Sequence, residues 1–192
     1  PEDLKWGLWE TIETRAFPGS VSNHHLGTLL GQLMAAYEMN AFKDEYQKAV
    51  VENAKYFAKS LAAEGLDVAG DPAMDYTETH QVIVKVGYAH GPEVANRLEA
   101  NNIICNYQAT PEEEGFSASG ALRMGVNEMT RFGFGKEDFA KLAHLIADCV
   151  LHNANVKDEV KKLREAHLDM HYCFSDKETD ALLADFAAAT GI

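Results

Sequence analysis

The stretch THQVIVKVGYAHGP, residues 79–92, decides the fold class. Residues 79–86 alternate polar and β-branched side chains, which is the pattern of a strand with one buried face. Pro92 then stands at the start of a helix, where its missing N–H costs no hydrogen bond. ALRMGV at residues 121–126 predicts another strand, and Ile103-Ile104-Cys105 predicts a short one between the two. Three strands around one helix indicate an α/β layer.

Helical patterns flank this layer on both sides. Apolar residues recur at helical spacing in residues 3–15, 25–40, 43–64 and 136–152, and Phe17-Pro18-Gly19-Ser20 interrupts the first of these. Gly65 is expected to end the third helix, and a capping box at Ser175–Glu178 begins a last one. The connection between the second and third strands is short. We therefore expect an α/β domain of the α+β kind, with helices packed on one face of a small mixed or antiparallel sheet.

The composition excludes several classes of partner. Acidic residues outnumber basic ones by 30 to 17, and the formal net charge is -13. Nucleic acids and anionic membranes require a basic face, so we expect neither as a partner. The sequence has no apolar run long enough for a bilayer, and residues 1–10 lack a signal peptide's pattern. Cys105, Cys149 and Cys173 form no C-x-x-C pair, which favours a reducing, cytoplasmic compartment.

Arg123 is the first candidate for a ligand contact. It stands within an apolar stretch, where a charged side chain is costly unless it has a partner. Its planar guanidinium can hold a carboxylate through two hydrogen bonds. A structural ion pair with one of the many acidic residues is the alternative interpretation.

Two histidine pairs are further candidates. Asn23-His24-His25 stand between a turn and a helix, where free backbone N–H groups can bind an anion. These histidines can also bind metal, stack on a ring or simply be solvated. His167 and His171, four residues apart on an expected helix, have the spacing of two zinc ligands. No third ligand accompanies them, so we expect an exposed helix face and no metal site.

Six short segments carry more information together than singly. They are Phe17-Pro18-Gly19, Tyr46-Gln47 with Val50, Val51, Asn53, Ala54 and Lys55, Thr77-Glu78-Thr79-His80, Asn102-Ile103 with Cys105, Asn106 and Pro111, Ser119-Gly120 with Arg123 and Gly125, and Thr130-Arg131-Phe132-Gly133-Phe134. In this order and nearly at this spacing, they resemble the motifs F-P-G, Y-Q-x-x-V-V-x-N-A-K, T-D-N-H, N-I-T-V-N-K-N-x-x-P, S-G-I-R-x-G and T-R-R-G-F of serine hydroxymethyltransferases. The resemblance covers about residues 6–150.

The resemblance implies a fold and a domain arrangement. The family has the aspartate-aminotransferase type of fold, which is fold type I of the pyridoxal-phosphate enzymes. Residues 1–40 would then close the large cofactor-binding domain, residues 41–155 would form the small α/β domain, and residues 156–192 would be a helical extension. We therefore expect the chain to be the C-terminal portion of a transferase that forms a homodimer or a higher homo-oligomer.

The resemblance also implies site residues. Arg123 would bind the α-carboxylate of an amino-acid substrate, and pyridoxal phosphate would be the electron sink for cleavage of the Cα–Cβ bond. The family's Schiff-base lysine lies in a T-H-K-T segment upstream of F-P-G. Lys5 has no such context, so no catalytic lysine is expected in this chain, which alone would be inactive. Ser22 and Asn23 stand in the family's Q-G-G turn, whose backbone reaches the phosphate of the partner subunit's cofactor.

The one-carbon acceptor is where the chain departs from the family pattern. Asn106-Tyr107-Gln108 replaces N-K-N, whose second asparagine helps to hold tetrahydrofolate. Interconversion of serine and glycine with tetrahydrofolate is the leading interpretation. A folate-independent threonine transaldolase or aldolase, or an α-methylserine-type enzyme, is an alternative. A stand-alone assembly module without catalysis is another.

Overall fold

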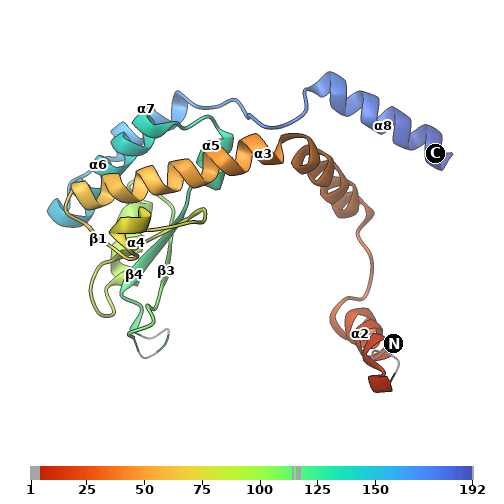
Figure 1. The fold of residues 1–192 in the computed structure, drawn as a ribbon, viewed down its shortest axis with the longest axis horizontal. Coiled ribbons are helices and arrows are strands. Elements are labelled where there is room, and N and C mark those ends of the chain that lie inside the picture. The colour runs from red at the N-terminus through yellow and green to blue at the C-terminus, as the bar shows by residue number, and fades with distance from the viewer. Residues whose placement is uncertain (1–4, 114, 116–117, 192) are drawn as a thin grey trace. The chain divides into compact units, whose positions relative to one another are not determined.

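The computed structural model describes residues 5–113, 115 and 118–191 (Figure 1). It divides into two compact units, Pro1–Ala41 and Phe42–Ile192. The elements, in chain order, are α2 (Leu8–Thr14), the π-helical turn η1 (Arg15–Ser20), α3 (Leu26–Ala63), β1 (Asp67–Val68), the 3-10 turn η2 (Pro72–Met74), β2 (Gln81–Lys85), α4 (Gly91–Ala100), β3 (Asn106–Gln108), β4 (Ala121–Gly125), α5 (Asn127–Arg131), α6 (Lys136–His152), α7 (Lys157–Glu165) and α8 (Asp176–Thr190).

The first unit contains α2, η1 and the first part of α3. The predicted interruption of the first helix is present, because Phe17 has extended backbone angles of φ -138 and ψ 125 within η1. The part of that predicted helix at residues 3 and 4 lies outside the described residues. No side chain of α2 or η1 is buried, so this unit has little core of its own.

Helix α3 corrects one prediction. We expected two helices, residues 25–40 and 43–64, but the structure has one 38-residue helix, Leu26–Ala63. Residues 32–64 contain neither Gly nor Pro, so nothing in the backbone chemistry interrupts the helix where the apolar pattern changes. The predicted stop is correct. Gly65 has φ +92, a conformation that glycine adopts at no steric cost, and its N–H bonds to Ala62.

The sheet in the second unit is antiparallel throughout, with strand order β1-β2-β4-β3. This confirms the predicted α/β class. Val82, Val84, Leu122 and Met124 are buried on one face of the sheet, where α3, α4 and α6 supply the rest of the core. The core includes Phe57 and Phe139, whose ring centroids lie 5.3 Å apart.

The predicted strand at Ile103-Ile104-Cys105 is wrong, since β3 begins only at Asn106. These residues complete the end of α4 instead. Asn102 has φ 64, its N–H bonds to Glu99 and the N–H of Ile103 bonds to Leu98, which is the Schellman pattern. Ile103 and Leu98 are both buried, as that pattern favours. The β-branched side chain of Ile103 therefore packs against the helix end rather than in a strand ladder.

A buried amide connects α3 to the segment after β4. Asn53 Nδ2 donates to Thr130 Oγ1 and to the carbonyl of Phe134, both at 3.0 Å. Thr130 Oγ1 in turn donates to the carbonyl of Val126 at 2.7 Å. Tyr46, two helical turns before Asn53, donates its hydroxyl to the carbonyl of Asn127 at 2.9 Å. Side chains of α3 thus hold α5 and the turn that follows it.

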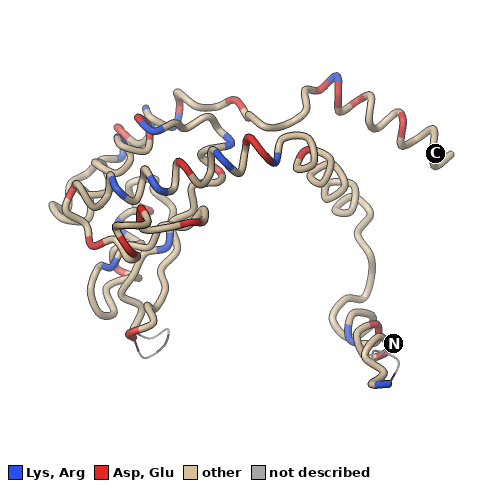
Figure 2. Tube along the Cα trace, in the orientation of Figure 1, with Lys and Arg blue, Asp and Glu red and all other residues tan. Residues whose placement is uncertain are grey.

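Charged side chains do not gather into a basic surface. Lys and Arg alternate with Asp and Glu along α3 in Figure 2. Within the part of the chain that the structure describes, no helix combines the length and the hydropathy that crossing a membrane requires.

We predict that Asn53→Ala lowers the free energy of unfolding by about 1–3 kcal/mol, because the Phe134 carbonyl loses its partner inside the protein. Glu52→Ala, at the exposed neighbouring position, is the matched control and should change it by less than about 0.5 kcal/mol. Urea denaturation followed by circular dichroism measures both values. Equal stability of the two variants would contradict a structural role for the Asn53 amide.

Candidate functional site

The open face of the sheet carries Arg123. Along β4, Leu122 and Met124 are buried, whereas Arg123 between them is exposed. Successive side chains of a strand point to opposite faces, so the apolar residues next to the arginine in the sequence do not enclose it. No acidic residue within the described ranges forms an ion pair with Arg123. Its charge is presented to the outside of this unit from a central strand.

The neighbours of Arg123 leave space around its guanidinium group. Ile83 of β2 and Asn106 of β3 lie directly opposite it in the ladder, so their side chains share its face. Along β4, the next residues on the same face are Ala121 and Gly125. The structure thus brings Asn106, which was expected near folate, beside Arg123. Gln108 lies on the same face, opposite Ala121.

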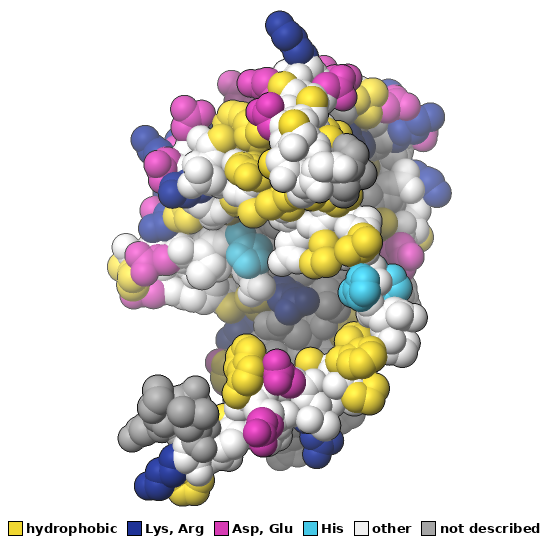
Figure 3. Space-filling model, turned by 90° about the vertical axis from the view of Figure 1, so that its right-hand side faces the viewer, with side chains coloured by type: hydrophobic (Ala, Val, Ile, Leu, Met, Phe, Trp, Pro, Cys, Tyr) yellow, Lys and Arg dark blue, Asp and Glu magenta, His cyan; other side chains and the backbone are white. Residues whose placement is uncertain are grey.

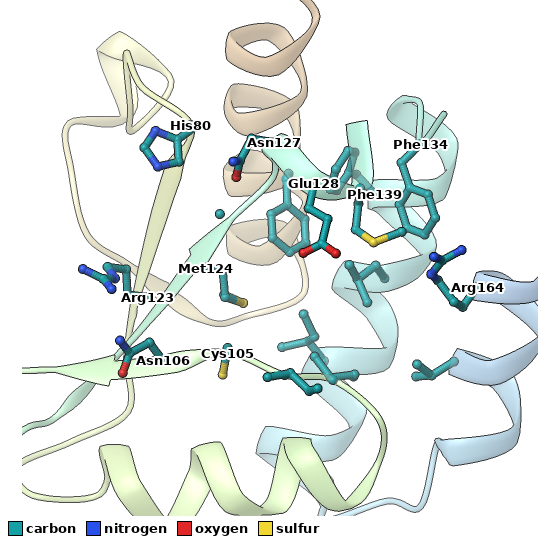
Figure 4. Close-up of a pocket in the computed structure, with 18 of the residues that line it drawn as sticks. His80, Cys105, Asn106, Arg123, Met124, Asn127, Glu128, Phe134, Phe139 and Arg164 are labelled. Carbon is teal, nitrogen blue, oxygen red and sulfur yellow. The ribbon is translucent and has the colours of Figure 1, made fainter. Parts of the chain in front are cut away.

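A cleft of about 730 Å³ lies along the last residues of β4, and Figure 4 shows Arg123 and Met124 on opposite sides of that strand. Polar residues that line the cleft include His80, Asn106, Arg123, Asn127 and Glu128. Apolar core side chains line its inner part, among them Met124, Phe134, Phe139 and Ile146.

His80 and Asn127 were not singled out as site residues from the sequence. Their proximity depends on Gly125: an added Cβ there would lie 3.0 Å from Asn127 Oδ1 and 3.5 Å from His80 Cδ2. Glycine at this position therefore leaves the space that Asn127 Oδ1 occupies, and an added Cβ would be in van der Waals contact with His80. The motif Thr77-Glu78-Thr79-His80 could have indicated His80 as a site residue. A sequence motif does not show, however, which strand its side chains will lie against.

Ser22, Asn23, His24 and His25 belong to the first unit and are exposed. They lie between η1 and α3, and the N–H of Leu29 makes the first bond of the helical series, to the carbonyl of His25. The amide groups of residues 26–28 consequently have no helical acceptor, and the start of a long helix favours negative charge.

His167 and His171 are not on a helix, because α7 ends at Glu165. This part of the prediction is wrong. The segment folds back over the turn at Gly133: the N–H of His171 bonds to the carbonyl of Arg131 at 2.7 Å, and His167 Nε2 lies 3.3 Å from Asp138 Oδ1. Among the described residues, no group of three or more potential ligands could hold a metal ion.

A family model for serine hydroxymethyltransferase matches residues 2–146 of the chain. The chain belongs to the serine hydroxymethyltransferase family. A serine hydroxymethyltransferase from Pyrobaculum arsenaticum is 37% identical over 171 residues, which are 87% of this chain and 40% of that protein. One from Archaeoglobus fulgidus is 38% identical over 177 residues, 89% of this chain and 40% of that protein. The chain thus spans about 40% of the length of these curated relatives.

A solved structure shows the same fold. The L-threonine transaldolase from Pseudomonas fluorescens, in its internal aldimine state, has a TM-score of 0.77 and 31% sequence identity, over 90% of this chain and 40% of that chain. The likeness confirms the predicted membership of fold type I. Within this chain, two of the serine hydroxymethyltransferase motifs meet, since Asn53 of one bonds to Thr130 and to the carbonyl of Phe134 of the other. Tyr46 bonds to the carbonyl of Asn127, three residues before Thr130.

Cys105, at the edge of the cleft, provides a test of its enclosure. Burial, with a smaller effect of Cys149, raises the pKa of the Cys105 thiol from 9.0 to about 11. At pH ~8 the reactive thiolate is then about 100-fold scarcer than for an ordinary thiol. We predict that iodoacetamide modifies Cys105 about 100-fold more slowly in the folded chain than in urea, as mass spectrometry of the peptides would measure. Similar rates in both states would show that the cleft does not enclose this thiol.

Proposed function

We propose that the chain is the C-terminal portion of a pyridoxal-phosphate enzyme that cleaves and forms the Cα–Cβ bond of a β-hydroxy amino acid. Interconversion of serine and glycine is the leading reaction. One observation carries the proposal: Arg123 presents its guanidinium on the open face of the central strand β4, with no ion-pair partner among the described residues, within the family motif Ser119-Gly120 to Gly125. Membership of the family supports the same reaction.

Arg123 acts by fixing the orientation of the substrate. A guanidinium can hold a carboxylate through two parallel hydrogen bonds, which set both the position and the rotation of the amino acid. Because β4 is paired on both sides, the arginine starts from a backbone that cannot swing away. Such an orientation places the bond to be cleaved where the cofactor can act on it.

Pyridoxal phosphate, when bound, supplies the electron sink for this cleavage. In this chain, the exposed turn with Ser22 and Asn23 would contact the phosphate through backbone N–H groups, on the partner subunit's cofactor. The lysine that carries the cofactor is expected outside this chain. The contribution of residues 1–192 is therefore to bind and orient the substrate and to complete a site across a subunit interface.

Two observations favour a folate-independent transaldolase as the second candidate. Gln108 stands where the family has an asparagine near folate, and the similar solved structure is a threonine transaldolase. The two hydroxymethyltransferases named above are 37% and 38% identical to the chain, against 31% for the transaldolase, which keeps the first candidate in the lead. In the first candidate, Asn106 and Gln108 would line the tetrahydrofolate region and the reaction would belong to cytoplasmic one-carbon metabolism.

The assignment of domains is part of the same proposal. Residues 1–40 would belong to the large cofactor-binding domain, residues 41–155 would be the small domain, and residues 156–192 would extend it. The first unit exposes many large apolar side chains, which suits a segment that packs on other parts of a homodimer. Hydrophobic side chains are visible at the surface in Figure 3. Those of the first unit that are more than half exposed are Trp6, Leu8, Trp9, Ile12, Phe17, Val21, Leu26 and Leu29.

We predict that Arg123→Lys in the full-length protein weakens amino-acid binding roughly 30- to 1,000-fold. Lysine keeps the charge but loses the two-pronged geometry, and a charge-assisted pair in a closed site is worth about 2–4 kcal/mol. Binding of pyridoxal phosphate and the melting temperature should change little. A calorimetric titration with serine and a thermal melt measure these effects. Unchanged serine affinity would make Arg123 a structural residue and remove the main support for the proposal.

We further predict that the 192-residue chain self-associates at tens of micromolar, because a second copy is the most direct partner for its exposed apolar side chains. The double variant Leu26→Gln and Leu29→Gln should reduce this association, and Lys59→Gln, on the exposed side of α3, is the control. Sedimentation velocity measures all three. A strictly monomeric parent chain would contradict the prediction.

A further inference from the structure

His80 is held firmly at the start of β2. Thr77 Oγ1 accepts the N–H of Thr79, and Thr79 Oγ1 accepts the N–H of Gln81, both at 3.1 Å. The carbonyl of His80 itself accepts the N–H of Val126 at 3.1 Å, which extends the β2–β4 ladder by one bond. The backbone of His80 is therefore fixed relative to β4, the strand that carries Arg123.

The imidazole of His80 lies beside Gly125, which is two residues after Arg123 on the same face of β4. Its Cδ2 lies 3.5 Å from the point where a Cβ of Gly125 would be. Two residues of a strand span about 6.6 Å. A carboxylate and a β-hydroxyl within one amino acid lie about 3–4 Å apart, and each hydrogen bond adds about 2.9 Å. The spacing of these two positions along β4 is therefore of the size that one amino acid and its hydrogen bonds can bridge.

The His80 side chain has no hydrogen bond or ion pair with any other described residue, and it is exposed. Several other histidines of the second unit differ in this respect. His90 pairs with Glu93, His144 with Glu64 and His167 with Asp138. The two ring nitrogens of His80 are thus free for a ligand, and imidazole can both donate and accept, as a hydroxyl group requires.

We propose that His80 contacts the β-hydroxyl group of the amino acid whose carboxylate is held by Arg123, and thereby selects β-hydroxy amino acids over amino acids without the hydroxyl. The inference rests on the proposed function of Arg123 and assigns the substrate class to a second residue of the site. A carboxylate clamp alone cannot make this selection, since all amino acids carry the carboxylate. A ligand without the hydroxyl leaves the His80 imidazole without a hydrogen-bond partner, and this lowers the affinity for that ligand.

The experiment compares L-serine with L-alanine, which differ only by the hydroxyl, in calorimetric titrations of the full-length protein loaded with pyridoxal phosphate. We expect His80→Ala to weaken serine binding about five- to thirty-fold, the effect of one lost hydrogen bond, with alanine binding changed less than about two-fold. His80→Gln keeps a donor and an acceptor and should recover part of the loss. His152→Ala, at the exposed end of α6, should change neither affinity.

Gly125→Ala tests the same inference without changing the histidine. Its added Cβ would lie 3.0 Å from Asn127 Oδ1 and in van der Waals contact with His80 Cδ2 at 3.5 Å, so it fills the space beside the imidazole and should also reduce the preference for serine over alanine. A thermal melt of every variant identifies any that fail to fold. If His80→Ala fails to fold, the binding data for His80→Gln and Gly125→Ala provide the test.

Two outcomes would overturn the inference: no loss of serine binding in the His80 variants, or an equal loss for serine and alanine. The result for Arg123→Lys separates this failure from that of the proposed function. If Arg123→Lys weakens both amino acids while His80→Ala changes neither, Arg123 keeps its role and only the role of His80 is refuted. If Arg123→Lys binds both as the parent does, the proposed site itself is wrong.

Discussion

The hydrogen bonds of Asn53 are the constraint on which the rest of the second unit depends. One buried amide group satisfies Thr130 and the carbonyl of Phe134, and Thr130 passes the connection on to Val126 at the end of β4. Since an unpaired polar group inside a core costs more than a hydrogen bond gains, these groups have few alternative arrangements. These bonds consequently fix helix α3 to the end of the central strand and to the turn after α5. Asn53 is 77 and 81 residues away from its two partners in the sequence.

This arrangement explains why a charged residue can stand in the central strand. β4 hides Leu122 and Met124 among the helices and presents Arg123 on the other face. The sheet thus has apolar packing on one side and an exposed arginine on the other. Ala121 and Gly125 are small, so the guanidinium is not covered by its own strand, and Gly125 leaves the space into which His80 and Asn127 lean.

The two units have different energetic characters. The second unit contains the buried core around Phe57, Phe139 and Ile146, whereas α2 and η1 of the first unit bury no side chain. Exposed tryptophan and leucine side chains are costly in water, which favours their burial against another surface. The matched relatives, of which this chain spans about 40%, contain a further 60% of chain in which such a surface can exist.

The sequence by itself determined the elements whose signals are local. Helix α6 and strand β4, the helix stop at Gly65 and the capping box before α8 follow from periodicity and backbone chemistry. The sequence also determined the family, because the order and spacing of its motifs can be read directly from the sequence. Only the tertiary structure decided that Ile103 completes a helix end rather than a strand, and that His167 and His171 leave their helix. It also decided that Arg123 faces outward beside Asn106, with His80 leaning over Gly125. These features depend on which strands pair and in which register, and pairing is set by burial between segments that no local pattern connects.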